Sequence, residues 1–134
     1  MIEFFLRDLY VELERESPPQ KNEQGVYVLP LNPKLSVTIT PLDPGALLTA
    51  PIAPFPQEKR EQFAIHMMKA NLLGQGTGGA VIGLEADEKF LTLSLAIPYD
   101  MNFKIFKEAL EDFANYVDFW RDEVKRHIAE ANQE

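Results

Sequence analysis

The stretch Ala70-Asn71-Leu72-Leu73-Gly74-Gln75-Gly76-Thr77-Gly78-Gly79, followed by Ala80-Val81-Ile82-Gly83-Leu84, decides how this chain folds. A helical pattern ends at the first glycine, and an apolar strand pattern follows the last one. Glycine commonly follows a helix C-terminus because it adopts the left-handed conformation without a Cβ penalty. We therefore predict a tight, left-handed exit from a helix into a strand.

The glycines of this stretch also match a nucleotide-binding pattern. Gly74, Gly76 and Gly79 fit G-x-G-x-x-G letter for letter. That pattern binds a pyrophosphate where it follows a strand and opens a helix, so that the helix amides point at the phosphates. The order is reversed in this chain. The sequence therefore argues against a nucleotide site, and we expect no cofactor.

Length, charge and cysteine content limit the function classes. The chain has 134 residues, which suits a single domain over residues 1–134, and its net charge is −8. An acidic chain repels nucleic acid and gains no attraction to anionic lipid. It has no cysteine, which excludes disulfides, thiolate nucleophiles and Cys-ligated zinc. Without a spanning apolar run or a secretory N-terminal pattern, we expect a cytosolic protein that inserts into no membrane.

Residues 2–16 carry the pattern of an amphipathic helix. Phe4 and Val11 project onto its polar side, one heptad apart, which hints at a contact surface. Ser17-Pro18-Pro19 is expected to end the helix. The apolar face is formed by Ile2, Phe5, Leu6, Leu9, Tyr10 and Leu13.

Nine of the ten prolines lie between residues 18 and 56, so this region is expected to form strands and turns. The expected strands are residues 26–31, 34–40 and 46–53. In the second, apolar residues alternate with Ser and Thr, which indicates a half-buried strand. Asp43-Pro44-Gly45 is a turn signal. Pro51 is expected to place the third strand at an edge or to end it, so its extent within residues 41–56 stays open.

A second helix is expected over residues 57–73, with Pro56 at its start. Its apolar residues fall on two nearly opposite sides, which is typical of a helix held between two surfaces. One side would face the sheet and the other a second protein molecule. The two sides are Phe63, Met67 and Ala70, and Ile65, Met68 and Leu72.

Two strands, residues 79–84 and 89–97, and a last helix, residues 102–130, complete the chain. The last helix carries a stripe of large apolar residues at spacings of three and four, which predicts a core-packing face. We therefore predict an α+β fold in which three helices accompany a twisted antiparallel five-stranded sheet, in the order α-β-β-β-α-β-β-α.

Catalytic chemistry finds little support in the sequence. The two histidines, His66 and His127, have no metal-ligand spacing, and a set of Ser94, His66 and Asp87 has no supporting motif. The last helix carries many carboxylates, as a solvated face would. We therefore expect neither an enzyme nor a metal site. These carboxylates are Glu108, Glu111, Asp112, Asp118, Asp122 and Glu123.

The amino-acid sequence of residues 70–121 resembles that of a known protein family. The matching pieces are Ala70-Asn71-Leu72-Leu73, Thr77-Gly78-Gly79-Ala80, Ile82-Gly83-Leu84, Leu91-Thr92-Leu93, Ile97-Pro98 and Trp120-Arg121. Together with the aromatic-rich last helix and the order of elements, they resemble the class I type III secretion chaperones, the CesT/SycE-like family. Members are small, acidic, cysteine-poor proteins of the bacterial cytosol. The proline-rich residues 41–56 depart from the pattern.

This resemblance implies a homodimer built by the middle helix and an adjoining strand. It implies that each dimer binds a secreted effector near the effector's N-terminus, in an extended form, with apolar side chains in grooves and short strands added to sheet edges. The expected dimer-interface residues are Phe63, Ile65, Met67, Met68, Leu72 and Ile82. The expected client-binding residues are Phe4, Val11, Val37 and Ile39.

The resemblance implies that the protein holds its client for export rather than transforming it. The alternative is a dimeric α+β protein-binding module or transcription cofactor unrelated to secretion. An enzyme comes third, because it would need a pocket with convergent polar groups.

Overall fold

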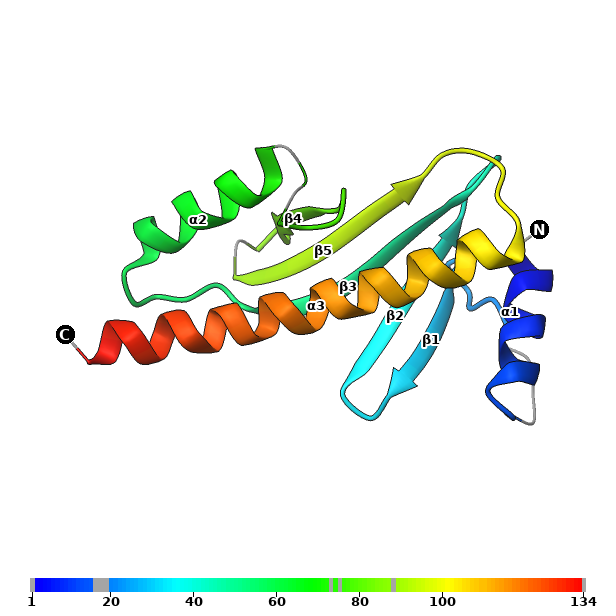
Figure 1. Cartoon of the computed structure of the whole chain (residues 1–134), viewed down its shortest axis with the longest axis horizontal. Helices are drawn as coiled ribbons and strands as arrows, with labels where there is room; N and C mark the ends of the chain where they lie inside the picture. The colour runs from blue at the N-terminus through cyan, green and yellow to red at the C-terminus, as the bar shows by residue number, and fades with distance from the viewer. Residues whose placement is uncertain (1, 16–19, 73, 75, 88, 134) are drawn as a thin grey trace.

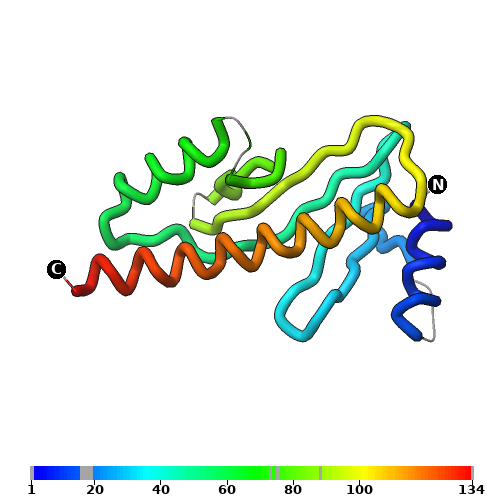
Figure 2. Tube along the Cα trace, viewed as in Figure 1, coloured from blue at the N-terminus to red at the C-terminus, as the bar shows by residue number. Residues whose placement is uncertain are grey.

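The computed structural model describes residues 2–15, 20–72, 74, 76–87 and 89–133. The order of its elements is α-β-β-β-α-β-β-α, which confirms the predicted fold class. Figure 1 shows α3 lying along one face of the sheet, and Figure 2 shows α1 and α2 at opposite ends of the molecule. The elements are α1 (Ile2–Glu12), β1 (Tyr27–Asn32), β2 (Leu35–Pro41), β3 (Ala46–Pro54), α2 (Arg60–Leu72), β4 (Val81–Leu84), β5 (Phe90–Ile97) and α3 (Phe103–Asn132).

The five strands form one antiparallel sheet in the order β1-β2-β3-β5-β4. Alternate residues of β2 and β5 point to the α3 side, as predicted for half-buried strands, and the side chains of Val37, Ile39 and Leu93 are fully buried there. The residues between them, such as Thr38 and Ser94, lie on the opposite face and are half-buried. In Figure 1, α3 is the described helix that runs along the sheet, on the side of the fully buried residues.

The stripe predicted on the last helix forms the other half of the core. Asn102 caps the helix, because its Oδ1 accepts a hydrogen bond from the Ile105 N–H at 2.8 Å. This cap fixes the start of α3 at Phe103, close to the predicted residue 102. The buried residues of α3 are Phe106, Leu110, Phe113, Val117, Trp120 and Val124.

The third strand differs from its prediction. Strand β3 is internal and passes through Pro51 rather than ending there. Its pairing with β2 ends at Thr49, while its pairing with β5 continues through Pro51. The proline is tolerated because its missing N–H lies where the β2 ladder has stopped. The guanidinium of Arg121 on α3 bridges this gap, donating to the carbonyls of Lys34 at 2.8 Å and Pro51 at 2.9 Å.

Two helix boundaries also differ. Helix α1 ends at Glu12 instead of residue 16, and Glu14 adopts a positive φ of 56° just beyond it. Helix α2 begins at Arg60 instead of residue 57, because Lys59 has a φ of 45° and cannot belong to a helix. The prolines expected to end the first helix, and Leu73 at the predicted end of the second, lie outside the described residues. None of the helices in the described part of the chain combines the length and the apolar character that a membrane span needs.

Candidate protein-binding surfaces

An apolar groove of about 580 Å³ lies between α1, α3 and the end of β1. Leu9 comes from α1, Leu13 directly follows the end of that helix, and Leu31 comes from β1. Leucines on the floor and charges at the rim are the arrangement expected of a site for an apolar side chain of a protein partner. The remaining lining residues are Glu12, Lys107, Leu110, Glu111, Ala114 and Asn115.

Aromatic packing attaches α1 to α3 beside this groove. The ring of Phe5 stacks on Phe106 of α3, with ring centroids 5.5 Å apart. At the rim, the Nζ of Lys107 lies 2.6 Å from the Glu12 carboxylate, so an ion pair joins the two helices beside the groove. The hydrogen bond to Glu12 raises the pKa of Lys107 above its ordinary value. This rim is therefore charged, while the floor is not.

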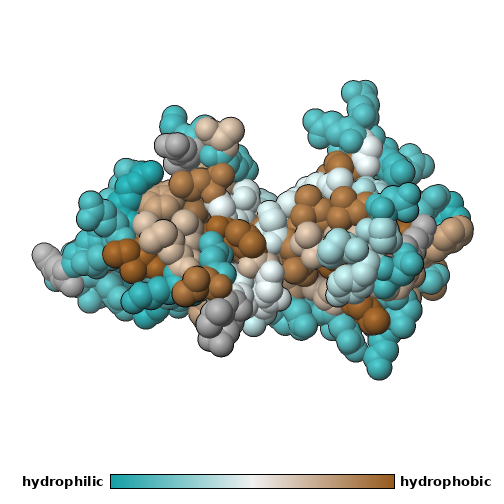
Figure 3. Space-filling view, turned by 90° about the horizontal axis from the view of Figure 1, so that it is seen from above, coloured by the Kyte–Doolittle hydropathy of each residue, from teal (hydrophilic) through white to brown (hydrophobic). Residues whose placement is uncertain are grey.

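A second apolar surface lies on the outer side of α2. Ile65, Met68 and Leu72 are 48%, 60% and 78% exposed, although they recur at helical spacing. Val81 and Leu84 of the neighbouring edge strand β4 are exposed as well. Figure 3 shows apolar side chains gathered at the end of the molecule that carries α2. Clustered, exposed apolar residues of this kind are typical of an interaction surface.

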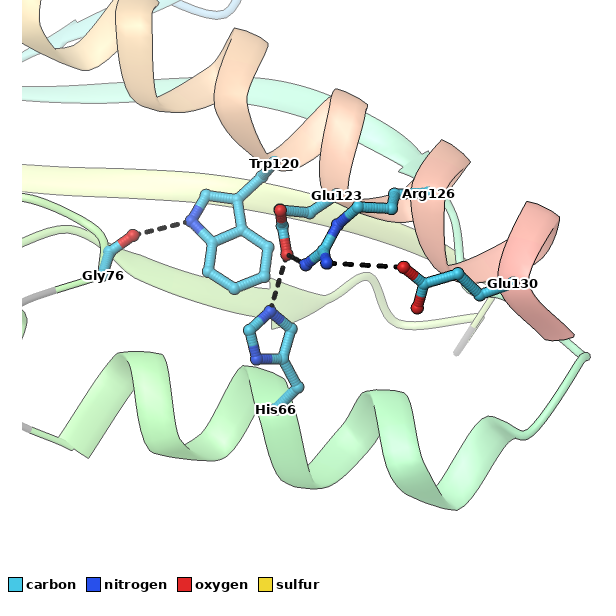
Figure 4. A network of polar contacts seen from close by, with 6 residues as sticks. All are labelled: His66, Gly76, Trp120, Glu123, Arg126 and Glu130. Carbon is cyan, nitrogen blue, oxygen red and sulfur yellow. Dashed lines mark hydrogen bonds and ion pairs between the residues drawn. The ribbon is translucent and has the colours of Figure 1, made fainter.

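The inner side of α2 is attached to the end of α3 (Figure 4). His66 lies over the ring of Trp120, with centroids 5.1 Å apart, and its Nε2 is 3.0 Å from the Glu123 carboxylate. The Nη2 of Arg126 donates to the same carboxylate at 2.6 Å. The indole N–H of Trp120 donates to the Gly76 carbonyl at 2.8 Å, which ties the glycine loop to α3 as well.

Asn71 attaches α2 to strand β4. Its side-chain amide donates to the Ile82 carbonyl and its Oδ1 accepts from the Ile82 N–H, both at 2.9 Å. The side chain thus makes the two hydrogen bonds that a neighbouring strand would make. The outer face of α2 and the edge strand β4 are therefore fixed next to each other.

Two titratable groups of this attachment have displaced pKa values: the hydrogen bond with Glu123 raises the pKa of Arg126, and the pKa of Glu123 is lowered. Partial burial raises the pKa of Glu123, but the hydrogen bonds from Arg126 and His66 outweigh burial and leave the pKa below its ordinary value. Glu123 was expected on a solvated face. That prediction was wrong, because the carboxylate is only 13% exposed.

The displaced pKa predicts how acid acts on stability. A folded-state pKa below the unfolded one contributes stability above the unfolded value, about 4.3 for Glu, and loses it as the pH falls through the folded value. Glu123→Gln is expected to lower the free energy of unfolding at pH 7 by about 1 kcal/mol and to flatten its fall between about pH 5 and pH 3. Urea denaturation across this pH range measures both. Glu130→Gln, at a position whose carboxylate is 65% exposed, is the matched control and should change neither by more than about 0.5 kcal/mol.

The structure corrects half of the residues expected at the dimer interface. Phe63 is only 1% exposed and packs edge-on against Trp120 and Phe55, so it belongs to the core. Ile82 is 3% exposed, because its side chain points inward from the edge strand. Met67 is half-buried and packs on the core. Ile65, Met68 and Leu72 are exposed, and their role at an interface stays a prediction.

Of the four expected client-binding residues, two are buried and two are exposed. The side chains of Val37 and Ile39 are fully buried on an internal strand, so they are not available to a client, and we withdraw them. Alternation identified their strand correctly, but alternation alone does not tell which face is open. Phe4 and Val11 are 63% and 76% exposed, on the side of α1 away from the groove. Their role with a client stays a prediction.

Sequence reasoning missed the residues that form the groove. Leu13 was placed on the core face of its helix, but it is 45% exposed and lines the groove, whereas Leu110 was correctly predicted as core, at 3% exposed, and also lines the groove. Leu31 and Ala114 gave no signal, because a strand end and a small helical residue are common everywhere. Over the described residues, no group of three or more metal-ligating side chains is found. His127 packs on Phe63 and lies 2.6 Å from the Glu58 carbonyl.

Comparison with known proteins agrees with this architecture. The model of the Tir chaperone protein (CesT) family matches residues 5–121. A protein of Chlamydia pneumoniae is 23% identical over 126 residues, covering 92% of this chain and 96% of its own. The chain belongs to the Tir chaperone protein (CesT) family.

Two solved structures share the fold. A chain of the HopA1–SchA chaperone–effector complex matches with a TM-score of 0.70 and 15% identity, covering 90% of this chain and 93% of its own. The structure of the Yersinia pestis type III secretion chaperone SycH, in complex with a stable fragment of YscM2, matches with a TM-score of 0.64 and 16% identity, covering 90% and 99%.

Proposed function

We propose that this protein is a type III secretion chaperone that binds the N-terminal region of a secreted effector in an extended form and keeps it competent for export. The observation that carries this proposal is the apolar groove between α1 and α3, which has leucines on its floor and no catalytic set within it. Family membership supports the chaperone over an unrelated binding module. The chaperone acts by occupying apolar segments of the client that would otherwise collapse or aggregate.

The groove is suited to bind a single apolar side chain of a client rather than the surface of a folded domain. A leucine or an aromatic side chain entering it would bury apolar area against Leu9, Leu31 and Leu110. The charged rim of Glu12 and Lys107 can bond the client's backbone or its polar neighbours. The net charge of −8 favours clients with basic segments.

We further propose that the chain is a homodimer through the outer face of α2. Exposed Ile65, Met68 and Leu72 would meet the same residues of a second copy, and the edge strand β4 lies beside them. A two-fold interface needs one self-complementary patch, and an apolar helix face supplies it.

The dimer prediction is tested by a substitution that places a charged side chain in the proposed interface. Met68→Glu is expected to raise the dimer dissociation constant at least a hundredfold, about 2.7 kcal/mol, because an unpaired carboxylate at an apolar interface is costly. Sedimentation equilibrium at micromolar concentration measures this. Gln62→Glu adds the same charge at the flank of the helix and serves as the control. A monomeric wild type at these concentrations would contradict the proposal.

The client prediction is tested by filling the groove. Ala114→Leu places a larger side chain into it and is expected to weaken effector binding at least tenfold, about 1.4 kcal/mol. The effector is obtained by co-purification from the native host, identified by mass spectrometry, and its protected segment is mapped by limited proteolysis. Ala129→Leu, at an exposed site of the same helix, is the control. Recovery of no secreted protein, or protection of a folded domain only, would refute the proposed function.

A further inference from the structure

One end of strand β5 lacks a neighbour on the β4 side. Strands β4 and β5 pair from Leu84–Leu91 to Val81–Ser94, and two residues further the same register would pair Gly79 with Ala96. Gly79 instead has a φ of 89° and donates its N–H to the Gly74 carbonyl at 3.0 Å. The glycine loop therefore leads the chain away from β5. In Figure 1, β4 lies beside only the first part of β5.

The backbone of Ala96 points into this opening. The Glu85 N–H donates a hydrogen bond to the Phe90 carbonyl, so the backbone groups of Phe90 point toward β4. In an antiparallel pair, every second residue points its N–H and C=O to the same neighbour. Thr92, Ser94 and Ala96 therefore also direct their backbone groups toward the β4 side. Among the described residues, no hydrogen-bond partner is found for Ala96 on that side. An unpaired N–H and C=O on a strand edge form a template for an added strand.

A cavity of about 210 Å³ lies beside this edge, roofed by α3. Its volume is below the roughly 300–1,000 Å³ of sites for small molecules, and it has room for one large side chain. Its wall combines apolar and aromatic side chains with polar groups, among them Thr77 and Asp112. The lining residues are Thr77, Gly78, Ala80, Leu95, Ala96, Ile97, Tyr99, Ala109, Asp112, Phe113 and Tyr116.

Residues 76–80, which border the cavity, are held by several contacts. Thr77 is 1% exposed, and its hydroxyl donates to the Ala80 carbonyl. Gly78 has a φ of 64°, and a Cβ there would lie 2.3 Å from the ring of Tyr116, so only glycine lets this ring close the cavity. Trp120 holds the loop through Gly76. The opening beside Ala96 is therefore a feature of the packed fold.

The two outer edges of the sheet are less suited to an added strand. The outward positions of β1 include Pro30, which has no N–H to donate. On β4, both outward backbone groups of Ile82 are already bonded by Asn71. The Ala96 edge combines free backbone groups with a side-chain cavity, which is the combination that extended-peptide recognition requires.

We propose that the β5 edge at Ala96 and its cavity form a second client site, which binds an extended segment of the effector as an added strand with one large apolar side chain in the cavity. This inference rests on the proposed function, and it separates the strand-addition site from the α1–α3 groove. The hydrogen bonds from Ala96 supply affinity for any sequence, and the cavity selects one side chain.

The test uses the full chain and two defined peptides, Lys-Thr-Thr-Thr-Phe-Thr-Thr-Thr-Lys and the same peptide with glycine at its centre. Amide NMR follows the titration. We expect the largest shift changes at residues 94–97, slowed exchange of the Ala96 amide, and at least tenfold tighter binding of the phenylalanine peptide. Binding of neither peptide at about 1 mM, or shift changes centred on β1 or the α1–α3 groove, would overturn the inference.

Two variants separate the backbone and side-chain contributions. Ala96→Pro removes the free N–H where proline is tolerated, and it should weaken both peptides at least tenfold. Ala109→Leu fills the cavity from α3, and it should remove the preference for phenylalanine while leaving the glycine peptide unchanged. Val28→Pro on the outer edge of β1 and Ala129→Leu at an exposed site of α3 are the matched controls and should change neither. Equal binding by Ala109→Leu and wild type overturns the inference even where Ala96→Pro fails to fold.

The same variants distinguish this inference from the proposed function. An effector that co-purifies equally with wild type, Ala96→Pro and Ala109→Leu leaves the chaperone function standing and overturns the second site. Failure to recover any effector refutes the chaperone function whatever the peptides do. Hydrogen exchange of the Ala96 amide is also measured without peptide at increasing protein concentration. If exchange becomes slower as the concentration rises, a second copy of the chain occupies the edge, and this result would also overturn the inference.

Discussion

Trp120→Ala is expected to lower the free energy of unfolding by about 3–5 kcal/mol, the range for removing a buried aromatic side chain. Trp120 is 1% exposed and packs edge-on against Phe63, with the ring of His66 5.1 Å away. Its loss would leave a cavity at the place where α2, α3 and the glycine loop meet. Urea denaturation followed by far-UV circular dichroism measures the change, since the variant removes the chain's only tryptophan.

Trp120→Phe separates packing from hydrogen bonding. It keeps an aromatic ring but leaves the Gly76 carbonyl without the indole N–H, so we expect about 1–2 kcal/mol of destabilisation. The alanine variant should also loosen α2, and therefore weaken the proposed dimer more than the phenylalanine variant does. A loss below about 1 kcal/mol for Trp120→Ala would show that α2 is not held through this residue.

Gly45→Ala is expected to lower the free energy of unfolding by about 4 kcal/mol or more, which is exceptional for the addition of one methyl group. Gly45 has a φ of 102°, a conformation that L side chains rarely adopt. An added Cβ would also lie 1.7 Å from the Ile97 carbonyl oxygen, a contact that backbone must move to relieve. The turn between β2 and β3 would have to shift away from the end of β5.

Gly25→Ala is the matched control for this prediction. Gly25 also has a positive φ, 78°, but a Cβ there meets no atom within 4 Å. The control therefore measures the conformational cost alone, about 1 kcal/mol. Thermal unfolding of both variants separates the steric contribution from the conformational one. Equal losses for the two glycines would contradict the close approach of the β2–β3 turn to β5.

The sequence predicted the elements of this fold because each carries a local signal. The alternation in β2, the stripe of α3 and the glycines after α2 depend on neighbours within a few residues. The positive φ values of Gly74 and Gly79 confirm the predicted left-handed exit. The family resemblance, read from residues 70–121, was confirmed by the family match over residues 5–121.

Predictions were less successful where the outcome depended on a contact with a residue distant in the sequence. Pro51 was expected to end or expose its strand, because a proline normally breaks a central ladder. Its strand is internal, because the pairing with β2 stops at Thr49 and Arg121, 70 residues away, bonds the free carbonyl of Pro51 instead. Glu123 was expected in solvent, but His66 and Arg126 make it a contact of α2. Neither partner could be assigned from spacing along the chain.

The sequence by itself determined the order of elements, the absence of cysteine chemistry, and the two-sided character of α2. Only the tertiary structure decided which apolar residues stay available to a partner. Phe63 and Ile65 are both apolar and lie two residues apart, yet one is 1% and the other 48% exposed. The groove and the Ala96 edge likewise exist because packed elements fail to meet at those places. Such openings depend on how segments that are distant in the sequence are positioned in space, and the local sequence pattern does not specify that arrangement.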